Sequence, residues 1–307
     1  MRLAVTGALN SALFDSLLTQ CAPCVRGEDR LLELDLSSAE WAYPSGLVPL
    51  ASLVRVLSQQ GIHIAVAKYP DSLTCSYYCW CNFFKCIGAN SPCAGGKESP
   101  GEDRAVKITE LVEHKIEKDS LTALSRLLQR LPKGVDATDF SRKSFIDACG
   151  EIVSNTRHAY EKRQDEDDIA GRPKALLQAQ FYPKAGRVEL CVCDCGRGIK
   201  RSMEGEHQEN YVSHLEAVDA ALVFRNKNPM GEGEGLGLSA LHTYIKKNGG
   251  TLRIRTGDAL KTQHGSKGAS STEELPIWNG TIVALEILVE KSADLSKIQK
   301  RLAKAAD

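Results

Sequence analysis

The segment GEGEGLGL, residues 231–238, places a glycine at every second position and leads into a helix predicted over 235–248. Glycine-rich backbone before a helix exposes N–H groups and the positive end of the helix dipole, which suits a phosphate group. No Gly-Lys-Ser or Gly-Lys-Thr follows, and no acidic residue about twenty positions on supports a dinucleotide-binding unit. The segment therefore indicates either an unusual phosphate-binding turn or a flexible hinge.

A second segment pairs a carboxylate with an amide. FIDACGEIVSNTRHAY, residues 145–160, predicts a helix that places Glu151 and Asn155 one turn apart on the same face. The amide oxygen of Asn155 suits Mg²⁺, and Glu151 could accept a proton from an attacking water molecule. By itself, the pattern fits a solvated helix face equally well.

A third segment, VELCVCDCGRGIK at residues 188–200, predicts a strand that runs into Asp194 and is followed by Gly196 and Gly198. A carboxylate at the end of a buried strand can accept a hydrogen bond from an exocyclic amine, and the glycines would let the backbone approach a flat ring. A tight turn with a polar cap is the alternative.

Taken together and in this order, the three segments resemble the GHKL ATPase superfamily, which contains DNA gyrase, MutL, histidine kinases and heat-shock chaperones. GEIVSN is similar to its N box, DCGRGI to its first glycine box and GEGEGLGL to its second, and NGTIVALEIL resembles its closing Gly-Thr strand. The resemblance covers about residues 141–290. It implies a two-layer α/β sandwich, the Bergerat-type fold, that binds ATP with Mg²⁺.

The resemblance also implies a role for each matching residue. Glu151 would be the general base, and Asn155 would be the Mg²⁺ ligand. Asp194 would hold the adenine amine, with Thr281 in support through a water molecule. The nucleotide-binding set would be completed by Gly196, Gly198, Ile199, Gly233, Gly235, Leu236, Gly237 and Leu238.

Residues 200–232 would form a mobile lid over the phosphates. Within it, Arg225 and Lys227 are either contacts to the γ-phosphate or solvated loop charges. One residue departs from the family pattern: His158 stands where gyrase-like and chaperone-like members favour Asp. This departure bears on the transfer of their hydrolytic mechanism more than on nucleotide binding.

The first third of the chain predicts a separate α/β domain. A strand over 31–38, a helix over 46–60 and a strand over 62–67 form a strand–helix–strand unit, which indicates parallel pairing. LDLSSAEWAYPSGLVPLASLVRVL, residues 34–57, resembles a STAS-like domain, with the resemblance covering about residues 1–95. STAS-like domains are mostly interaction modules, so the resemblance implies a protein partner.

In bacterial anti-sigma systems, a GHKL-type kinase phosphorylates a STAS serine that precedes a glycine at a helix start. Ser45 precedes Gly46 at that place, which makes Ser45 a candidate phosphoacceptor. We favour the simpler interpretation that Ser45 is the helix N-cap. A phosphoacceptor histidine at His114 is disfavoured, because it lacks the His-Glu and nearby proline context.

Four segments follow from these patterns: a STAS-like domain at 1–96, a linker and helical connector at 97–140, the ATP-binding domain at 141–293, and a helical tail at 294–307. Helical periodicity is predicted over 106–131, and 199–230 shows no clean pattern. The polar stretch 258–274 is expected to connect two strands.

The eleven cysteines and the absence of a recognisable signal peptide predict a cytoplasmic chain with reduced thiols. Cys191 and Cys193 should share one strand face as small buried thiols. Cys21 and Cys24 have metal-ligand spacing and could form a Zn²⁺ site with two members of a second group. Packed reduced thiols are favoured, because zinc ligands usually come as two tight pairs. The second group is Cys75, Cys79, Cys81, Cys86 and Cys93.

Composition narrows the functions further. The 39 basic and 39 acidic side chains give a formal charge of zero, so no chain-wide attraction to nucleic acid or anionic lipid is expected. Apolar runs stay below the ~18 residues of a membrane helix. We therefore expect a regulatory ATP-binding protein, either a slow Mg²⁺-dependent ATPase coupled to a partner, an anti-sigma-type serine kinase, or a nonhydrolysing scaffold. Many relatives dimerise, so a homodimer stays open.

Overall fold

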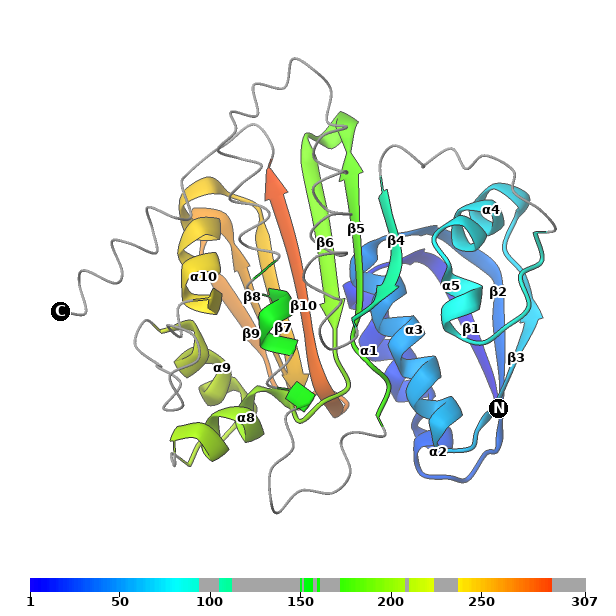
Figure 1. Cartoon of the computed structure of the whole chain (residues 1–307), viewed down its shortest axis with the longest axis horizontal. Helices are drawn as coiled ribbons and strands as arrows, with labels where there is room; N and C mark the ends of the chain where they lie inside the picture. The colour runs from blue at the N-terminus through cyan, green and yellow to red at the C-terminus, as the bar shows by residue number, and fades with distance from the viewer. Residues whose placement is uncertain are drawn as a thin grey trace.

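The computed structural model of the chain describes residues 1–93, 105–111, 150, 152–156, 159–160, 172–207, 210–223 and 237–288. These residues form two units, each built on its own sheet (Figure 1). The N-terminal unit has a three-stranded parallel sheet, and the C-terminal unit has a seven-stranded antiparallel sheet. The predicted mixed α/β class is confirmed.

The N-terminal unit has the strand order β1-β2-β3 and confirms the predicted parallel pairing. The helix predicted over 46–60 begins at Pro44 in the structure. Proline is tolerated in this first turn because its missing N–H costs little there. The strands are β1 (Arg2–Leu9), β2 (Leu31–Ala42) and β3 (His63–Lys68), and the helices are α1 (Ser11–Gln20), α2 (Ala22–Val25), α3 (Pro44–Gln59), α4 (Ser72–Trp80) and α5 (Phe83–Cys86).

The C-terminal unit has the strand order β4-β5-β6-β10-β7-β8-β9. Its longer helices lie against one face of this sheet, on the left in Figure 1, while the N-terminal unit lies on the other side. The strands are β4 (Ala105–Glu110), β5 (Leu176–Tyr182), β6 (Arg187–Cys193), β7 (Thr251–Gly257), β8 (Ala259–His264), β9 (Ala269–Thr272) and β10 (Trp278–Leu288), and the helices are α8 (Gly198–His207), α9 (His214–Leu222) and α10 (Gly237–Asn248).

Strand β4 corrects part of the predicted helical connector. Residues 105–110 pair with β5 at the edge of the large sheet, so the helix predicted from residue 106 is wrong there. Ile108 is buried between the two units, while its neighbour Lys107 is exposed. This alternation has the period of a strand, and the open edge of β5 supplied the pairing partner.

Two further expectations are also corrected. The stretch 199–230, which shows no clean sequence pattern, contains α8 and α9. The polar stretch 258–274 contains β8 and β9, the last two strands of the sheet. β9 is exposed along its whole length, so its residues show none of the apolar alternation by which a half-buried strand is recognised.

The central strands of the large sheet are buried on both faces. Along β6, Val188, Leu190 and Val192 belong to the core under α9 and α10, whereas Cys191 and Cys193 belong to the core shared with the N-terminal unit. The prediction that these two thiols are buried on one strand face is confirmed. Burial raises the pKa of both thiols well above its usual range.

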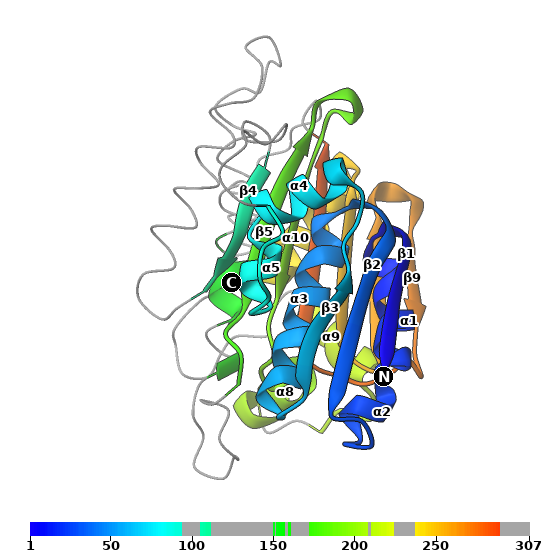
Figure 2. The ribbon, with the colours of Figure 1, turned by 90° about the vertical axis from the view of Figure 1, so that its right-hand side faces the viewer.

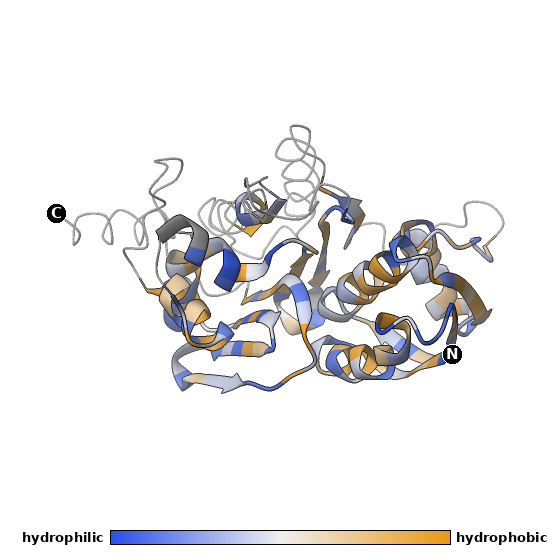
Figure 3. Ribbon diagram, turned by 90° about the horizontal axis from the view of Figure 1, so that it is seen from below, coloured by the Kyte–Doolittle hydropathy of each residue, from blue (hydrophilic) through white to orange (hydrophobic). Residues whose placement is uncertain are grey.

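The N-terminal unit covers the second face of the sheet, with α3 packed against β5 and β6 (Figure 2). Phe14 of α1 meets Trp278 of β10 edge to face, with ring centroids 5.5 Å apart. Figure 3, a view from below, shows apolar residues on the helices and strands of the N-terminal unit and on the strands of the large sheet. One hydrophobic cluster therefore runs through both units.

Polar contacts join the same two surfaces. The Arg255 side chain on β7 is 4% exposed, and its Nε lies 2.9 Å from Oδ1 of Asp15 on α1. The Arg255 guanidinium also donates to the carbonyls of Gly257 and Pro276. Tyr77 of α4 donates to Gln180 of β5 over 2.6 Å.

Among the described helices, none combines the length and apolar character needed to cross a bilayer.

Replacing Arg255 by methionine should lower the free energy of unfolding by about 3 kcal/mol or more, because it leaves Asp15 and two carbonyls without their buried donor. Urea denaturation of the full chain measures the loss. The matched control is Arg26→Met, which breaks an exposed pair with Glu28 and should cause no measurable change. Equal losses in the two variants would contradict a stabilising role for the inter-unit pair.

Candidate functional site

Asp194 is the buried carboxylate around which the predicted site residues gather. It follows the last residue of β6 and is 4% exposed. Gly196 N–H donates to its Oδ1 over 2.9 Å, and Thr281 on β10 also hydrogen-bonds its carboxylate. Burial raises the pKa of Asp194 to about 7, although the bonds from Gly196 and Thr281 lower it. The described bonds leave acceptor capacity on this carboxylate, since two oxygens offer about four lone pairs.

Close approaches of the backbone determine the shape of the loop after Asp194. A Cβ on Gly196 would lie 2.3 Å from the carbonyl oxygen of Ala159. Gly280, with φ +140°, brings its Cα to the Asp194 carbonyl, where a Cβ would lie at 2.1 Å. Glycine at both positions is therefore required by contacts within the protein, whereas for Gly196 the sequence suggested contact with a ligand ring.

Two residues that the sequence did not single out hold this loop. The Tyr160 hydroxyl accepts from the Cys195 N–H at 3.0 Å and donates to the Pro173 carbonyl at 2.7 Å. Arg172 Nη1 donates to the carbonyls of Cys195 and Gly196. Tyr160 is the last residue of the FIDACGEIVSNTRHAY segment, so that motif could have pointed to it as a site residue. No sequence pattern indicates Arg172.

The helix predicted to carry Asn155 lies beside the loop. Residues 152–156 and 159–160 are helical, and Ile152 and Val153 are buried in the core under α9 and α10. Asn155 is half-buried and lies one turn before Ala159, so the two share a face of the helix. Because Ala159 contacts Gly196, the structure brings the Asn155 helix to the Asp194 loop.

The start of α8 is attached to the end of the sheet. Gly198 begins this helix, and the N–H of Ile199 donates to Thr256 Oγ1 over 3.3 Å. Thr256 in turn donates to the Gly280 carbonyl over 2.8 Å. Ile199 also packs against the core under α9 and α10. Thr256, which the sequence did not indicate, thus links the glycine loop to the strand that carries Thr281.

The second glycine segment is described only at its end. Gly237, which is buried, and Leu238, which packs on the core under α10, are the first residues of that helix. The predicted lid, residues 200–232, contains most of α8 and all of α9. Seven other residues named in the sequence analysis, together with Glu151, lie outside the described residues: Gly233, Gly235, Leu236, Arg225, Lys227, His114 and His158.

Ser45 lies at the contact between the units. Its backbone N–H donates to Oε1 of Glu189 on β6 over 3.0 Å, and the side chain is buried. The N-cap of α3 is Tyr43, so the prediction that Ser45 is the N-cap is wrong. The Glu189 carboxylate, from far along the chain, satisfies a first-turn donor instead. Burial raises the pKa of Glu189, although the bonds from Ser45 lower it.

The cysteines gather differently from the zinc set that the sequence left open as the disfavoured alternative. Cys21 is buried next to Cys24 at the junction of α1 and α2, and burial raises the pKa of its thiol to about 12. The group that approaches metal-ligand geometry within the described residues consists of Cys75, Cys79 and Cys93. The proposed combination with Cys21 and Cys24 is therefore not formed.

A scan of the chain against protein-family models gives no match, and a search of curated proteins finds no significant similarity.

Replacing Gly196 by alanine should lower the free energy of unfolding by about 1–3 kcal/mol, because the new Cβ would overlap the backbone of Ala159. Thermal or urea denaturation measures the change. Gly150→Ala is the matched control: Gly150 is helical and has no atom within 4 Å of its Cβ position. That control should be neutral or stabilising by up to about 1 kcal/mol. A Gly196→Ala variant with the same free energy of unfolding as the unaltered chain would refute the close contact between the Asp194 loop and the helix that carries Ala159.

Proposed function

We propose that this chain binds ATP with Mg²⁺ in a GHKL-type site, hydrolyses it slowly, and couples nucleotide binding to a protein partner. The observation that carries the proposal is the convergence of the helical residues 152–156 and 159–160, the Asp194 loop and Thr281 around one buried carboxylate. These three segments come from separate parts of the chain.

The chemistry of Asp194 supports an adenine-binding role. A buried acceptor discriminates strongly for a ligand that brings a donor, because leaving it unpaired costs free energy. The exocyclic amine of adenine is such a donor. An ionised carboxylate accepts it best, since charge-assisted hydrogen bonds are roughly twice as strong as neutral ones.

The position of Asn155 supports the metal-binding part of the proposal. Its amide oxygen is a neutral hard ligand that suits Mg²⁺, and its helix contacts the Asp194 loop through Ala159. When bound, Mg²⁺ would neutralise phosphate charge. Glu151, one turn before Asn155 in sequence, would accept the proton of the attacking water molecule.

The architecture also favours this family over a P-loop or dinucleotide fold. The strands β5, β6, β10, β7 and β8 are neighbours in an antiparallel sheet with α9 and α10 on one face, which fits a Bergerat-type sandwich. The N-terminal unit has a parallel sheet with α3 directly after β2, as expected for a STAS-like domain. Its partner would bind surfaces of this unit other than α3, which packs against the large sheet.

Two alternative outcomes of the chemistry stay open within the same site. In the first, the γ-phosphate is transferred to a serine of a STAS domain, and in the second ATP is bound without turnover. Ser45 of this chain is buried against Glu189, so a phosphoryl group there would meet a carboxylate. Phosphorylation of Ser45 therefore requires the two units to separate, which favours hydrolysis or a serine on another chain.

Substitution of Asp194 by asparagine should weaken ATP binding about 10- to 100-fold, since a hydrogen bond to a charged group contributes about 1.5–3 kcal/mol. For the unaltered chain, ATP affinity should rise as the pH increases through about 7, because deprotonation of Asp194 creates the better acceptor. Calorimetry at several pH values measures both effects. The variant should lose this pH dependence, while Asp29→Asn in the N-terminal unit should keep it.

If Asp194→Asn binds ATP as tightly as the unaltered chain at every pH, adenine is not held at Asp194. Circular dichroism of both variants separates a local loss of binding from unfolding.

Substitution of Glu151 by glutamine should leave ATP affinity within about threefold and abolish phosphate release, because only the hydrolytic step needs a base. Phosphate release and intact mass are measured after incubation with Mg²⁺ and ATP. Phosphate release by the unaltered chain without added mass supports hydrolysis, whereas a phosphoryl adduct on the chain or on a partner supports the kinase alternative. Equal phosphate release by both proteins would exclude Glu151 as the base.

A further inference from the structure

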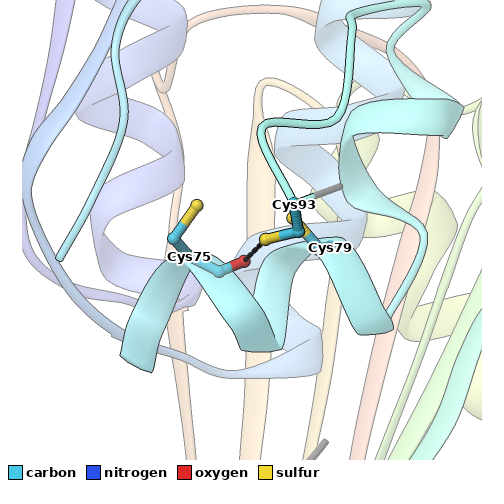
Figure 4. A group of neighbouring side chains, drawn as sticks. All are labelled: Cys75, Cys79 and Cys93. Atoms are coloured by element: carbon cyan, nitrogen blue, oxygen red, sulfur yellow. Dashed lines mark hydrogen bonds between the residues drawn. The ribbon is translucent and has the colours of Figure 1, made fainter. Parts of the chain in front are cut away.

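Three cysteine side chains converge in the N-terminal unit, on elements that carry none of the proposed nucleotide-binding residues. The Sγ atoms of Cys75, Cys79 and Cys93 all lie within 4.8 Å of one another. Cys75 and Cys79 are one turn apart on α4, and the segment after α5 returns Cys93 to that helix (Figure 4). We propose that these three thiols bind a thiophilic metal ion, Zn²⁺, with its fourth coordination position open to solvent.

Two contacts position the Cys93 and Cys79 side chains. Cys93 Sγ approaches the Cys75 carbonyl at 3.9 Å, and Ser91 Oγ donates to Cys79 Sγ over 3.2 Å. Thiolates around a tetrahedral zinc ion, with Zn–S bonds of about 2.3 Å, lie about 3.8 Å apart. The observed separations need only small side-chain rotations to reach this value. The elements that carry the ligands are therefore already in place.

The exposure of the three residues suits an ion that keeps one open position. Cys75 is buried, Cys79 is half-buried and Cys93 is exposed, so the group opens from the interior of the unit to its surface. A metal ion held there can exchange with solvent, and a water molecule can complete its coordination. Closed structural zinc sites, in contrast, use four protein ligands.

Disulfide bonding accounts for the group less completely. Residues one helical turn apart have Cβ atoms about 5–6 Å apart, whereas a disulfide needs about 3.5–4.5 Å. Cys75 and Cys79 therefore cannot bridge each other while α4 is intact. A bond from Cys93 to either of them would leave the third thiol without a role, whereas a metal ion uses all three.

As thiolates the three sulfurs would repel one another, and a bound divalent cation would compensate their charge. Burial first, and then the neighbouring Cys79 and Cys93, raise the pKa of Cys75 to about 12. The pKa of Cys93 is also raised, first by burial and then by Cys79. Without metal, the Cys75 and Cys93 thiols therefore stay protonated near neutral pH. Binding of one Zn²⁺ then forms three Zn–S bonds and releases three protons to solvent, one from each thiol.

The test uses the full chain, reduced and kept free of oxygen, titrated with Co²⁺ as a spectroscopic substitute for Zn²⁺. We expect one Co²⁺ per chain, with thiolate charge-transfer absorption and the intense visible bands of tetrahedral cobalt. Zn²⁺ should displace both signals. In weakly buffered solution at pH 7, Zn²⁺ uptake should release about three protons per ion. None of these readouts depends on ATP binding.

Single serine variants of Cys75, Cys79 and Cys93 should each weaken Co²⁺ binding at least tenfold. The matched control is Cys86→Ser, which removes a half-buried thiol of the same unit outside the group and should keep the affinity. Cys93→Ser is the decisive variant, because its exposed side chain can be changed without disturbing the core. A reduced chain that takes up no Co²⁺, or a Cys93→Ser variant that keeps the unaltered affinity and spectrum, overturns the proposal.

Discussion

The structure depends on one constraint: the central strands of the large sheet are apolar on both faces, so both faces must be covered. Alternate residues of β6 enter two different cores, one under α9 and α10 and one shared with the N-terminal unit. Leaving either face in water would expose several fully buried side chains, each contributing about 1.5–3 kcal/mol. The N-terminal unit therefore shares one hydrophobic cluster with the large sheet.

This shared core places the proposed nucleotide site and the proposed interaction module on opposite faces of the same strand. Asp194 and Glu189 both belong to the β6 region, one at the glycine loop and the other at the first turn of α3. A change at the loop could therefore reach α3 through a few residues of one strand. The buried Glu189 carboxylate that binds the Ser45 N–H is a polar contact that separation of the units would have to break. The proposed coupling between nucleotide state and partner binding would therefore need only the short route along β6.

Strong local patterns were sufficient for much of the fold. Apolar periodicity identified α3, β5, β6 and α10, and the strand–helix–strand order predicted the parallel sheet. The predictions failed where neighbours in space decide the conformation. β4 is a strand because β5 offers an unpaired edge, and β9 is a strand because β8 does, although β9 is exposed along its length. Helices α8 and α9 lie in the stretch 199–230, where the sequence analysis predicted no element.

The sequence by itself determined which residues could carry chemistry: a carboxylate at a strand end, an amide on a helix face, glycines beside them, and eleven cysteines. Residue type and local spacing are enough for such assignments, because they depend on side-chain chemistry and on the periods of helix and strand. Only the tertiary structure decided which of these groups meet. It joined the Asn155 helix to the Asp194 loop through Ala159 and Gly196, and it brought together Cys75, Cys79 and Cys93, apart from Cys21 and Cys24. The physical reason is that such contacts join segments far apart in the chain, and the packing of buried faces alone determines them.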